Sequence, residues 1–222
     1  MSTDPRFTNW PRKRLKFCAS YNDEVLSETT DEFKQIEYVE ISDVSLVGGI
    51  EKTTPMLFHE APSRARRKVR TGDILISTVR TYLKAIAAVA NASDDLVAST
   101  GFCVIRPSTE LIPGYAGWIA KSEEFVGEVV SRSVGVSYPA INASQLVDIT
   151  IPVPPPLVQQ RIAAFLDEKT AQIDALIAKL GGSSQSFQQN GSFSKKNLLG
   201  LLLEYRSALI SAAVTGQIAS LG

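Results

Sequence analysis

The sequence predicts an α+β fold, with a mixed, β-rich domain at residues 1–153 and a long helical, coiled-coil-like region at residues 154–222. Short segments of β-forming residues, separated by turn signals, fill most of the first 150 positions. A cluster of prolines between positions 152 and 156 ends this pattern, and apolar residues then recur at helical spacing. Hydrophobic residues make up 44% of the chain, which is enough for a packed core.

The β-rich part is expected to contain several short strands and two helices. The run after the turn signal Thr71-Gly72-Asp73 is continuously apolar, as in a buried strand, whereas the apolar residues of 115–131 have helical spacing. In chain order, strands are predicted at Ile36–Ile41, Asp73–Val79, Ala85–Val89 and Gly101–Ile105, helices at Tyr115–Lys121 and Ser122–Ser131, a turn-rich loop at Gly135–Asn142 and a strand at Leu146–Val153.

The helical region carries two apolar stripes separated by a polar insert. Because residues 181–195 are rich in glycine, serine and glutamine, they predict a flexible interruption of the helix. A stripe must be buried against something, so the two helices either fold back on each other or pair with a second chain, and the sequence leaves both open. The stripes consist of Ile162, Leu166, Ile173, Ile177 and Leu180, and of Leu198, Leu202, Tyr205, Leu209 and Ala213.

Charge is balanced overall but segregated along the chain. The 23 basic and 23 acidic side chains give zero net charge, which taken alone argues against a nucleic-acid partner. Five cations nevertheless occupy residues 64–70, while acidic residues concentrate between positions 23 and 43. Such a chain can present one basic face. The other interpretation, that these runs are solvated surface, stays open.

Sequence signals for catalysis and metal binding are missing. Neither a phosphate-binding glycine loop nor a nucleophile elbow occurs. Cys18, Cys103 and His59 do not have the spacing of a zinc site, and Glu32-Phe33-Lys34 matches only part of some nuclease sites. We therefore predict no catalytic residue and no metal ligand. The polar first ten residues and the lack of a long apolar run predict a cytoplasmic protein.

Two separated blocks carry a resemblance to a known family. Residues 149–167 read ITIPVPPPLVQQRIAAFLD and are followed by the heptad-like run Ile173-Asp174-Ala175-Leu176-Ile177. Residues 201–218 read LLLEYRSALISAAVTGQI. These blocks resemble, in order, the conserved region of Type I restriction-modification specificity subunits, and weaker matches such as GDILIS at 72–77 lie upstream. The chain resembles half of such a subunit, with one target recognition domain and one helical region.

The resemblance implies a function in DNA recognition without catalysis by this chain. In that family a target recognition domain reads a DNA half-site, and the helix acts as a spacer on which methyltransferase and restriction subunits assemble. A half-subunit is expected to form a homodimer that reads a gapped palindrome. No cofactor is expected on this chain, since S-adenosylmethionine, ATP and Mg²⁺ belong to the partner subunits.

Three loops are expected to supply the DNA contacts. Arg80 and Tyr82 are predicted near bases, and Arg66, Arg67 and Lys68 at phosphates, because arginine forks and cations suit these two tasks. The full predicted DNA-binding set is Arg64, Arg66, Arg67, Lys68, Arg70, Arg80, Thr81, Tyr82, Lys84, Arg132, Ser133, Ser137 and Tyr138. The predicted dimer or partner contacts are Ile162, Leu166, Ile173, Ile177, Leu180, Leu202, Tyr205 and Leu209.

Two other functions remain open at this point. One is a regulatory or inhibitory half-subunit that competes for methyltransferase subunits, because it would use the same scaffold. The other is a stand-alone nuclease, against which the missing phosphate and methyl-donor motifs argue.

Overall fold

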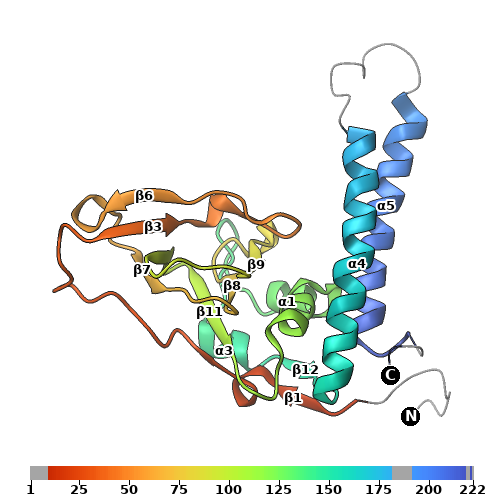
Figure 1. Cartoon of the computed structure of the whole chain (residues 1–222), viewed down its shortest axis with the longest axis horizontal. Coiled ribbons are helices and arrows are strands. Elements are labelled where there is room, and N and C mark those ends of the chain that lie inside the picture. The colour runs from red at the N-terminus through yellow and green to blue at the C-terminus, as the bar shows by residue number, and fades with distance from the viewer. Residues whose placement is uncertain (1–9, 182–191, 219–220, 222) are drawn as a thin grey trace.

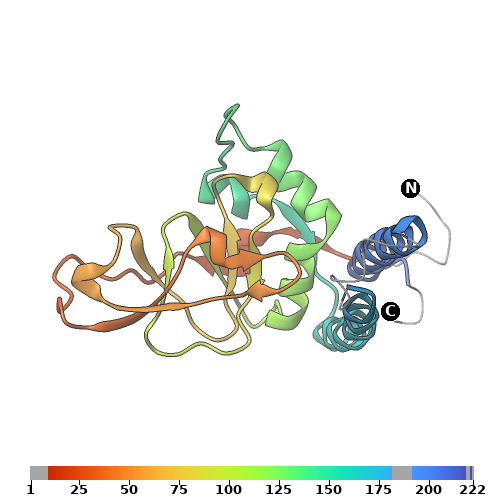
Figure 2. The same cartoon turned by 90° about the horizontal axis from the view of Figure 1, so that it is seen from above.

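The computed structural model describes residues 10–181, 192–218 and 221, and within them it has the predicted α+β architecture. A β-rich body lies on one side of the molecule, and an antiparallel pair of long helices stands beside it and extends past it (Figure 1). Seen along the helix pair, the body and the helices are two adjoining parts (Figure 2).

Two four-stranded sheets form the body. One has the order β6-β3-β10-β7 and contains one parallel pair, β3 with β10. The other has the order β2-β11-β8-β9 and is antiparallel throughout. The strands of the first sheet are β3 (Gln35–Val39), β6 (Thr54–Leu57), β7 (Ala65–Lys68) and β10 (Leu96–Ser99). Those of the second are β2 (Ala19–Tyr21), β8 (Ile74–Ser77), β9 (Ile86–Ala88) and β11 (Phe102–Pro107).

Shorter elements complete the body. Two-stranded pairs join β1 (Arg12–Arg14) to β12 (Thr150–Pro152) and β4 (Val44–Ser45) to β5 (Gly49–Ile50). The 3₁₀ turns are η1 (Leu15–Phe17), η2 (Ile41–Asp43), η3 (Phe58–Glu60) and η4 (Thr81–Leu83). Helices α1 (Pro113–Lys121), α2 (Glu123–Ser131) and α3 (Ala143–Val147) follow the sheets in the chain.

The predicted strand at Leu146–Val153 is wrong in its first half. Leu146 and Val147 end helix α3, and only Thr150–Pro152 forms a strand. Asn142 begins this helix, since its carbonyl accepts from the amide of Leu146 and its own amide donates to the Gln145 side chain. The sequence signal for this start, Asn142 followed three residues later by Gln145, is a capping box.

Helix α4 (Pro156–Gly181) and helix α5 (Ser192–Val214) pack against each other within the chain. Of the predicted insert at 181–195, residues 182–191 lie outside the described residues, and helix α5 begins at Ser192, before the insert's predicted end. Gly216 has a positive φ of 80° just beyond α5, the conformation in which glycine commonly ends a helix. A hairpin therefore exists in the single chain, which was one of the two arrangements that the apolar stripes allowed.

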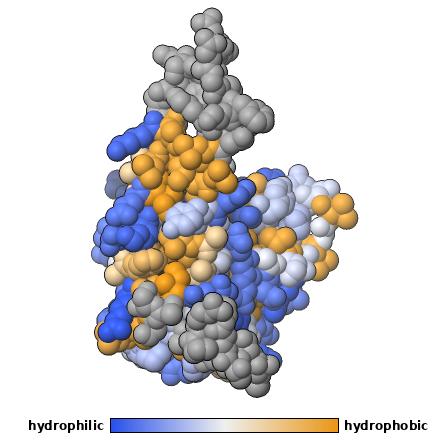
Figure 3. All heavy atoms as spheres, turned by 90° about the vertical axis from the view of Figure 1, so that its right-hand side faces the viewer, coloured by the Kyte–Doolittle hydropathy of each residue, from blue (hydrophilic) through white to orange (hydrophobic). Residues whose placement is uncertain are grey.

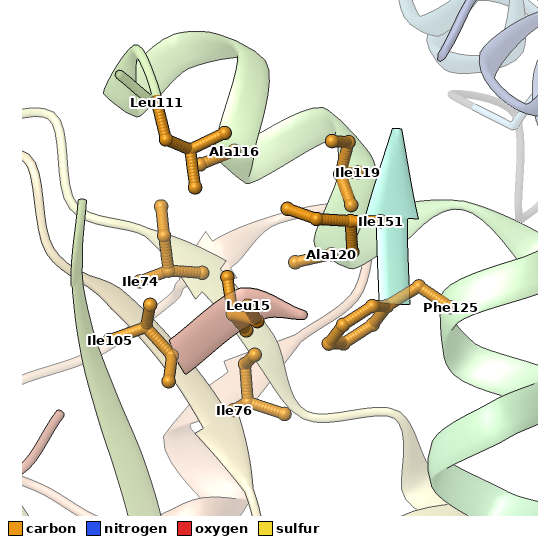
Figure 4. A pocket seen from close by; sticks show the side chains of 10 residues that line it. All are labelled: Leu15, Ile74, Ile76, Ile105, Leu111, Ala116, Ile119, Ala120, Phe125 and Ile151. Atoms are coloured by element: carbon orange, nitrogen blue, oxygen red, sulfur yellow. The ribbon is translucent and has the colours of Figure 1, made fainter. Parts of the chain in front are cut away.

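The main core lies between the second sheet, helices α1 and α2, and the base of the hairpin. Figure 4 shows its centre, where Ile74, Ile76 and Ile105 of the sheet face Ile119 of α1 and Phe125 of α2. The space that remains there is about 10 Å³, which is at most the room for one water molecule. This cavity is therefore a packed core and no ligand site.

Both cysteines are fully buried in this core. Burial raises the pKa of the Cys103 thiol from its ordinary 9.0 to about 12 and also raises the pKa of Cys18. At neutral pH this lowers the thiolate fraction of Cys103 about thousandfold. We expect iodoacetamide to leave both thiols unmodified in the native protein and to label both after unfolding, as read by mass spectrometry. Rapid labelling of the folded chain would contradict this packing.

Candidate nucleic-acid interface

The loop after strand β8 holds two residues in a rare backbone conformation. Arg80 and Lys84 flank the 3₁₀ turn η4 with φ of 49° and 53°, in the left-handed region that residues other than glycine seldom adopt. Such a conformation costs on the order of 1 kcal/mol or more and is concentrated at functional sites. The carbonyls of Val79 and Gly101 hold the loop, since Ser77 and Thr78 donate to them over 2.6 and 2.9 Å.

A second loop reaches the same place from 50 residues further along the chain. The hydroxyls of Thr81 and Ser133 share a hydrogen bond of 2.8 Å, and the amide of Ile141 donates to the carbonyl of Thr78. The guanidinium of Arg80 lies over the ring of Tyr138, 4.7 Å from its centroid. The structure thus brings two of the three predicted loops together. We call the joint surface of residues 78–84 and 132–140 the reading surface.

Most polar side chains of the reading surface are available to a ligand. Tyr82, Lys84, Ser137 and Tyr138 are exposed, and within the described part of the chain Lys84 has no ion-pair or hydrogen-bond partner for its side chain. Arg132 is different because its Nε and Nη2 both donate to one carboxylate oxygen of Glu128, over 3.0 and 2.7 Å. Arg132 must therefore leave Glu128 before it can contact a phosphate.

The third predicted loop, residues 64–70, lies mainly on strand β7. Its first residue, Arg64, is the one that approaches the reading surface. The carbonyl of Arg64 accepts a hydrogen bond from the amide of Thr100, and the carbonyl of Gly101, which follows Thr100, accepts one from the amide of Thr78 in the reading surface. Arg64 is exposed. Its guanidinium has no partner in the described part of the chain. We place Arg64 at the margin of the reading surface.

The other cations of this cluster are engaged within the body. Lys68 and Arg70 both pair with Glu24, at 3.7 and 2.8 Å, and Arg66 lies over the ring of Phe58 at 4.8 Å. Arg67 is half-buried, and its Nε has no hydrogen-bond partner. The predicted phosphate contacts of these residues stay predictions, and each of the paired ones requires an exchange of partner.

Sequence reasoning missed the apolar part of the reading surface. Val134, Val136 and Leu83 are strongly exposed there, and Thr78 ties the two loops together. No pattern in the sequence distinguishes an exposed valine in a loop from a buried one. The available signal was Gly135, which has a φ of 121° and marks a tight turn.

Polar contacts of helix α4 join the helix hairpin to the body. Gln159 at the start of α4 is fully buried, and its side chain accepts from Ile112 and donates to the carbonyls of Glu110 and Pro154, each over 2.8 Å. Trp118 of α1 donates to Asp167 of α4 over 2.9 Å. Because the buried amide of Gln159 has partners for its oxygen and for both of its N–H groups, it fixes the direction in which the hairpin leaves the body.

Helix α5 also docks on the body through charged and hydroxyl side chains. Arg206 pairs with Asp174 of α4 over 2.9 Å and lies over the ring of Trp118. Ser207 donates to the carboxylate of Glu123, whose amide donates to Ser211. The two sequence blocks that carry the family resemblance therefore meet, since Asp174 belongs to one and Arg206 to the other.

The predicted dimer residues divide into two groups. Ile162, Leu166 and Ile173 are buried within the chain, where α1 and α5 cover helix α4. The remaining members are partly or largely exposed, namely Ile177, Leu180, Leu202, Leu209 and Tyr205. Only this second group is free to meet another molecule without unfolding of the chain.

The described residues contain neither a cluster of metal-binding side chains nor a membrane-spanning helix. Between residues 10 and 218, apart from the undescribed stretch 182–191, no group of three or more histidine, cysteine, aspartate or glutamate side chains could hold a metal ion. In the same part of the chain, no helix has both the length and the apolarity that crossing a membrane requires.

Comparison with known proteins gives a consistent result. The family model described as Type I restriction modification DNA specificity domain matches residues 64–180. The EcoKI specificity subunit of Escherichia coli K12 is 27% identical over 154 residues, and the StySPI specificity subunit of Salmonella potsdam is 27% identical over 152 residues. Each alignment covers 68% of this chain and 30% of the relative.

Solved structures agree with the sequence matches. The HsdS subunit of Thermoanaerobacter tengcongensis is 32% identical with a TM-score of 0.68, and the match covers 81% of this chain and 46% of that one. A structure described as the basis of complex assembly and conformational transition of the type I R-M system is 29% identical with a TM-score of 0.73, covering 82% and 47%. The chain spans about half the length of these structures. Since the family model matches more than half of its residues, the chain belongs to the Type I restriction modification DNA specificity domain family.

Proposed function

We propose that this chain reads one half of a bipartite DNA site through the reading surface and contributes no catalytic group of its own. The observation that carries the proposal is the contact of Arg80 with Tyr138 across two loops, with Arg80 and the nearby Lys84 both in strained left-handed backbone. Family membership supplies the class of ligand. Arg80 and Tyr82 serve the bases, and Arg64 and Lys84 serve phosphates at the margin.

The helix hairpin is proposed to hold two copies of the chain together. One reading surface and one hairpin account for about half of the solved structures that the chain matches, so a second copy would supply the rest. Figure 3 shows a patch of hydrophobic residues along the hairpin. The large apolar side chains that the helices leave most exposed are Leu157, Leu176, Leu198, Leu201, Leu203 and Tyr205. A symmetric pair would read a palindrome with a gap between its halves.

Partner subunits complete the proposed complex. Methyltransferase subunits would dock on the hairpin and its junction with the body, and a restriction subunit would join them in the cytoplasm. S-adenosylmethionine, ATP and Mg²⁺ would be bound by those subunits. A competing role, in which the chain only sequesters methyltransferase subunits, predicts the same docking without DNA methylation.

Methylome sequencing of cells that carry this chain with its methyltransferase partner tests the proposal. We expect methyladenine in a gapped palindrome. Because one good bidentate contact discriminates about 10- to 100-fold between bases, Arg80→Ala combined with Lys84→Ala should relax the motif or abolish methylation. Lys52→Ala is the matched control, since Lys52 is an exposed cation outside the reading surface. Stable co-purification of all subunits with no methylation would favour the sequestering role instead.

A further inference from the structure

The tip of the reading surface is a short, structured finger formed by residues 134–140. The amide and carbonyl of Val134 and Ala140 exchange two hydrogen bonds of 2.8 and 3.0 Å, which closes the finger as an antiparallel bridge. Gly135 makes the turn possible, because its φ is 121° and a Cβ there would lie 3.1 Å from the carbonyl oxygen of Tyr138. In Figure 2 the green-to-teal finger stands out from the body next to η4.

The finger exposes apolar side chains to an unusual degree. Val136 is 103% exposed, Val134 78% and Tyr138 65%. Exposed valines are common on an irregular loop. This finger is different, because hydrogen bonds hold its base to the body on two sides. Ser133 donates to the carbonyl of Val129 at the end of α2, and Ile141 donates to Thr78. The fold therefore holds Val136 at the point of a rigid projection.

We propose that the finger enters the major groove and that Val136 recognises the 5-methyl group of a thymine. This inference rests on the proposed function. The major groove admits a two-stranded ribbon, and the thymine methyl is the one apolar group that an unmodified base presents there. A valine offers only methyl groups, so it detects a methyl group and cannot serve as a hydrogen-bond reader.

Charge and rigidity favour this occupant over another protein surface. Arg80 adjoins the finger and Lys84 ends the same 3₁₀ turn, and a duplex supplies the phosphates that such cations bind. The guanidinium of Arg80 lies against the ring of Tyr138, so these two side chains on the finger's flank are ordered before DNA binds. A contact whose side chains are already ordered loses less entropy on binding.

The test begins with the full chain in complex with its methyltransferase partner. Selection from random duplexes first gives the recognised motif. Each thymine of the motif is then replaced in turn by deoxyuridine, which removes only the 5-methyl group. We expect one position at which this replacement weakens binding about fourfold, the effect of one buried methyl group. Val136→Ala should weaken binding to the thymine duplex and remove the difference between thymine and deoxyuridine at that position.

Val47→Ala is the control, because Val47 is half-exposed in the turn between β4 and β5, outside the finger. It should retain the full thymine preference. A selected motif that is indifferent to deoxyuridine at every position, or that contains no A·T pair, would overturn the inference and leave the proposed function intact. Unstacking of 2-aminopurine beside the finger without methyl dependence would likewise overturn it, since that result indicates a wedge. If no motif is selected at all, the proposed function itself fails.

Discussion

Replacing Leu166 with glutamate is expected to unfold the junction between the hairpin and the body, and not merely to separate two subunits. Leu166 is fully buried in the main apolar core, where helix α4 packs against α1 and α5. Burying an unpaired charge in such a core costs about 4 kcal/mol or more, a large share of the stability of a small protein. Chemical denaturation followed by circular dichroism should show a lowered midpoint or no folded baseline.

Leu176→Glu is the matched control on the same helix. Leu176 is half-exposed on α4, so we expect the free energy of unfolding to change by no more than about 0.5 kcal/mol. If the outer face of the hairpin forms the proposed dimer, this variant should be folded and monomeric by light scattering. A folded Leu166→Glu protein of unchanged stability would show that α4 is not packed against the body. A dimeric Leu176→Glu protein would place the dimer contact elsewhere.

Replacing Asp73 with alanine is expected to destabilise the body by about 3 kcal/mol. Asp73 is buried at the start of β8 and accepts two hydrogen bonds from Arg106, over 2.9 and 2.8 Å, and one from the amide of Arg70. Its removal leaves a half-buried guanidinium without its main partner, which costs several kcal/mol in comparable cases. Strand β8 leads directly into the loop that carries Arg80, so sequence preference should weaken as well.

Alanine substitutions at the two neighbouring carboxylates, Glu24 and Asp23, should destabilise the body less than the one at Asp73. Glu24 also accepts from Arg106, over 2.6 Å, but is less buried than Asp73, and Asp23 lies 3.7 Å away. Alanine at Glu24 should therefore cost less than at Asp73, and alanine at Asp23 should cost about 0.5 kcal/mol or less. Equal effects at all three positions, measured by urea denaturation, would contradict the assignment of Asp73 as the main partner.

The pH dependence of stability should follow from the same cluster. The hydrogen bond from Arg106, with a smaller contribution from Arg70, holds the pKa of Glu24 below its ordinary 4.5. Since the folded state binds the proton less readily than the unfolded state, this contribution is present above about pH 4.5 and is lost as the pH falls through the lower, folded value. In the Glu24→Gln variant, the free energy of unfolding should therefore depend less steeply on pH in this acidic range.

Local patterns in the sequence were sufficient for most elements of the fold. The apolar run after Gly72-Asp73, the helical spacing of residues 115–131 and the seven-residue repeat of Leu166 and Ile173 depend on neighbours in the chain, and the structure confirms the strand and helices they predict. The strand predicted at Leu146 was wrong because the apolar pair Leu146-Val147 fits a strand or a helix equally well, and the capping box of Asn142 and Gln145 starts a helix there. The two motif blocks, found in the right order along the chain, were also sufficient to identify the family.

The sequence by itself therefore determined the α+β class, the family and the candidate cations, all of which depend on residues close together in the chain. Only the tertiary structure decided which loops share a surface, because strand pairing and helix packing bring Arg80 to Tyr138 and Asp174 to Arg206 across long separations. It also decided which half of the apolar stripe is covered. Periodicity fixes the face of a helix on which Leu166 and Leu176 lie, but the burial of each depends on what packs there in space.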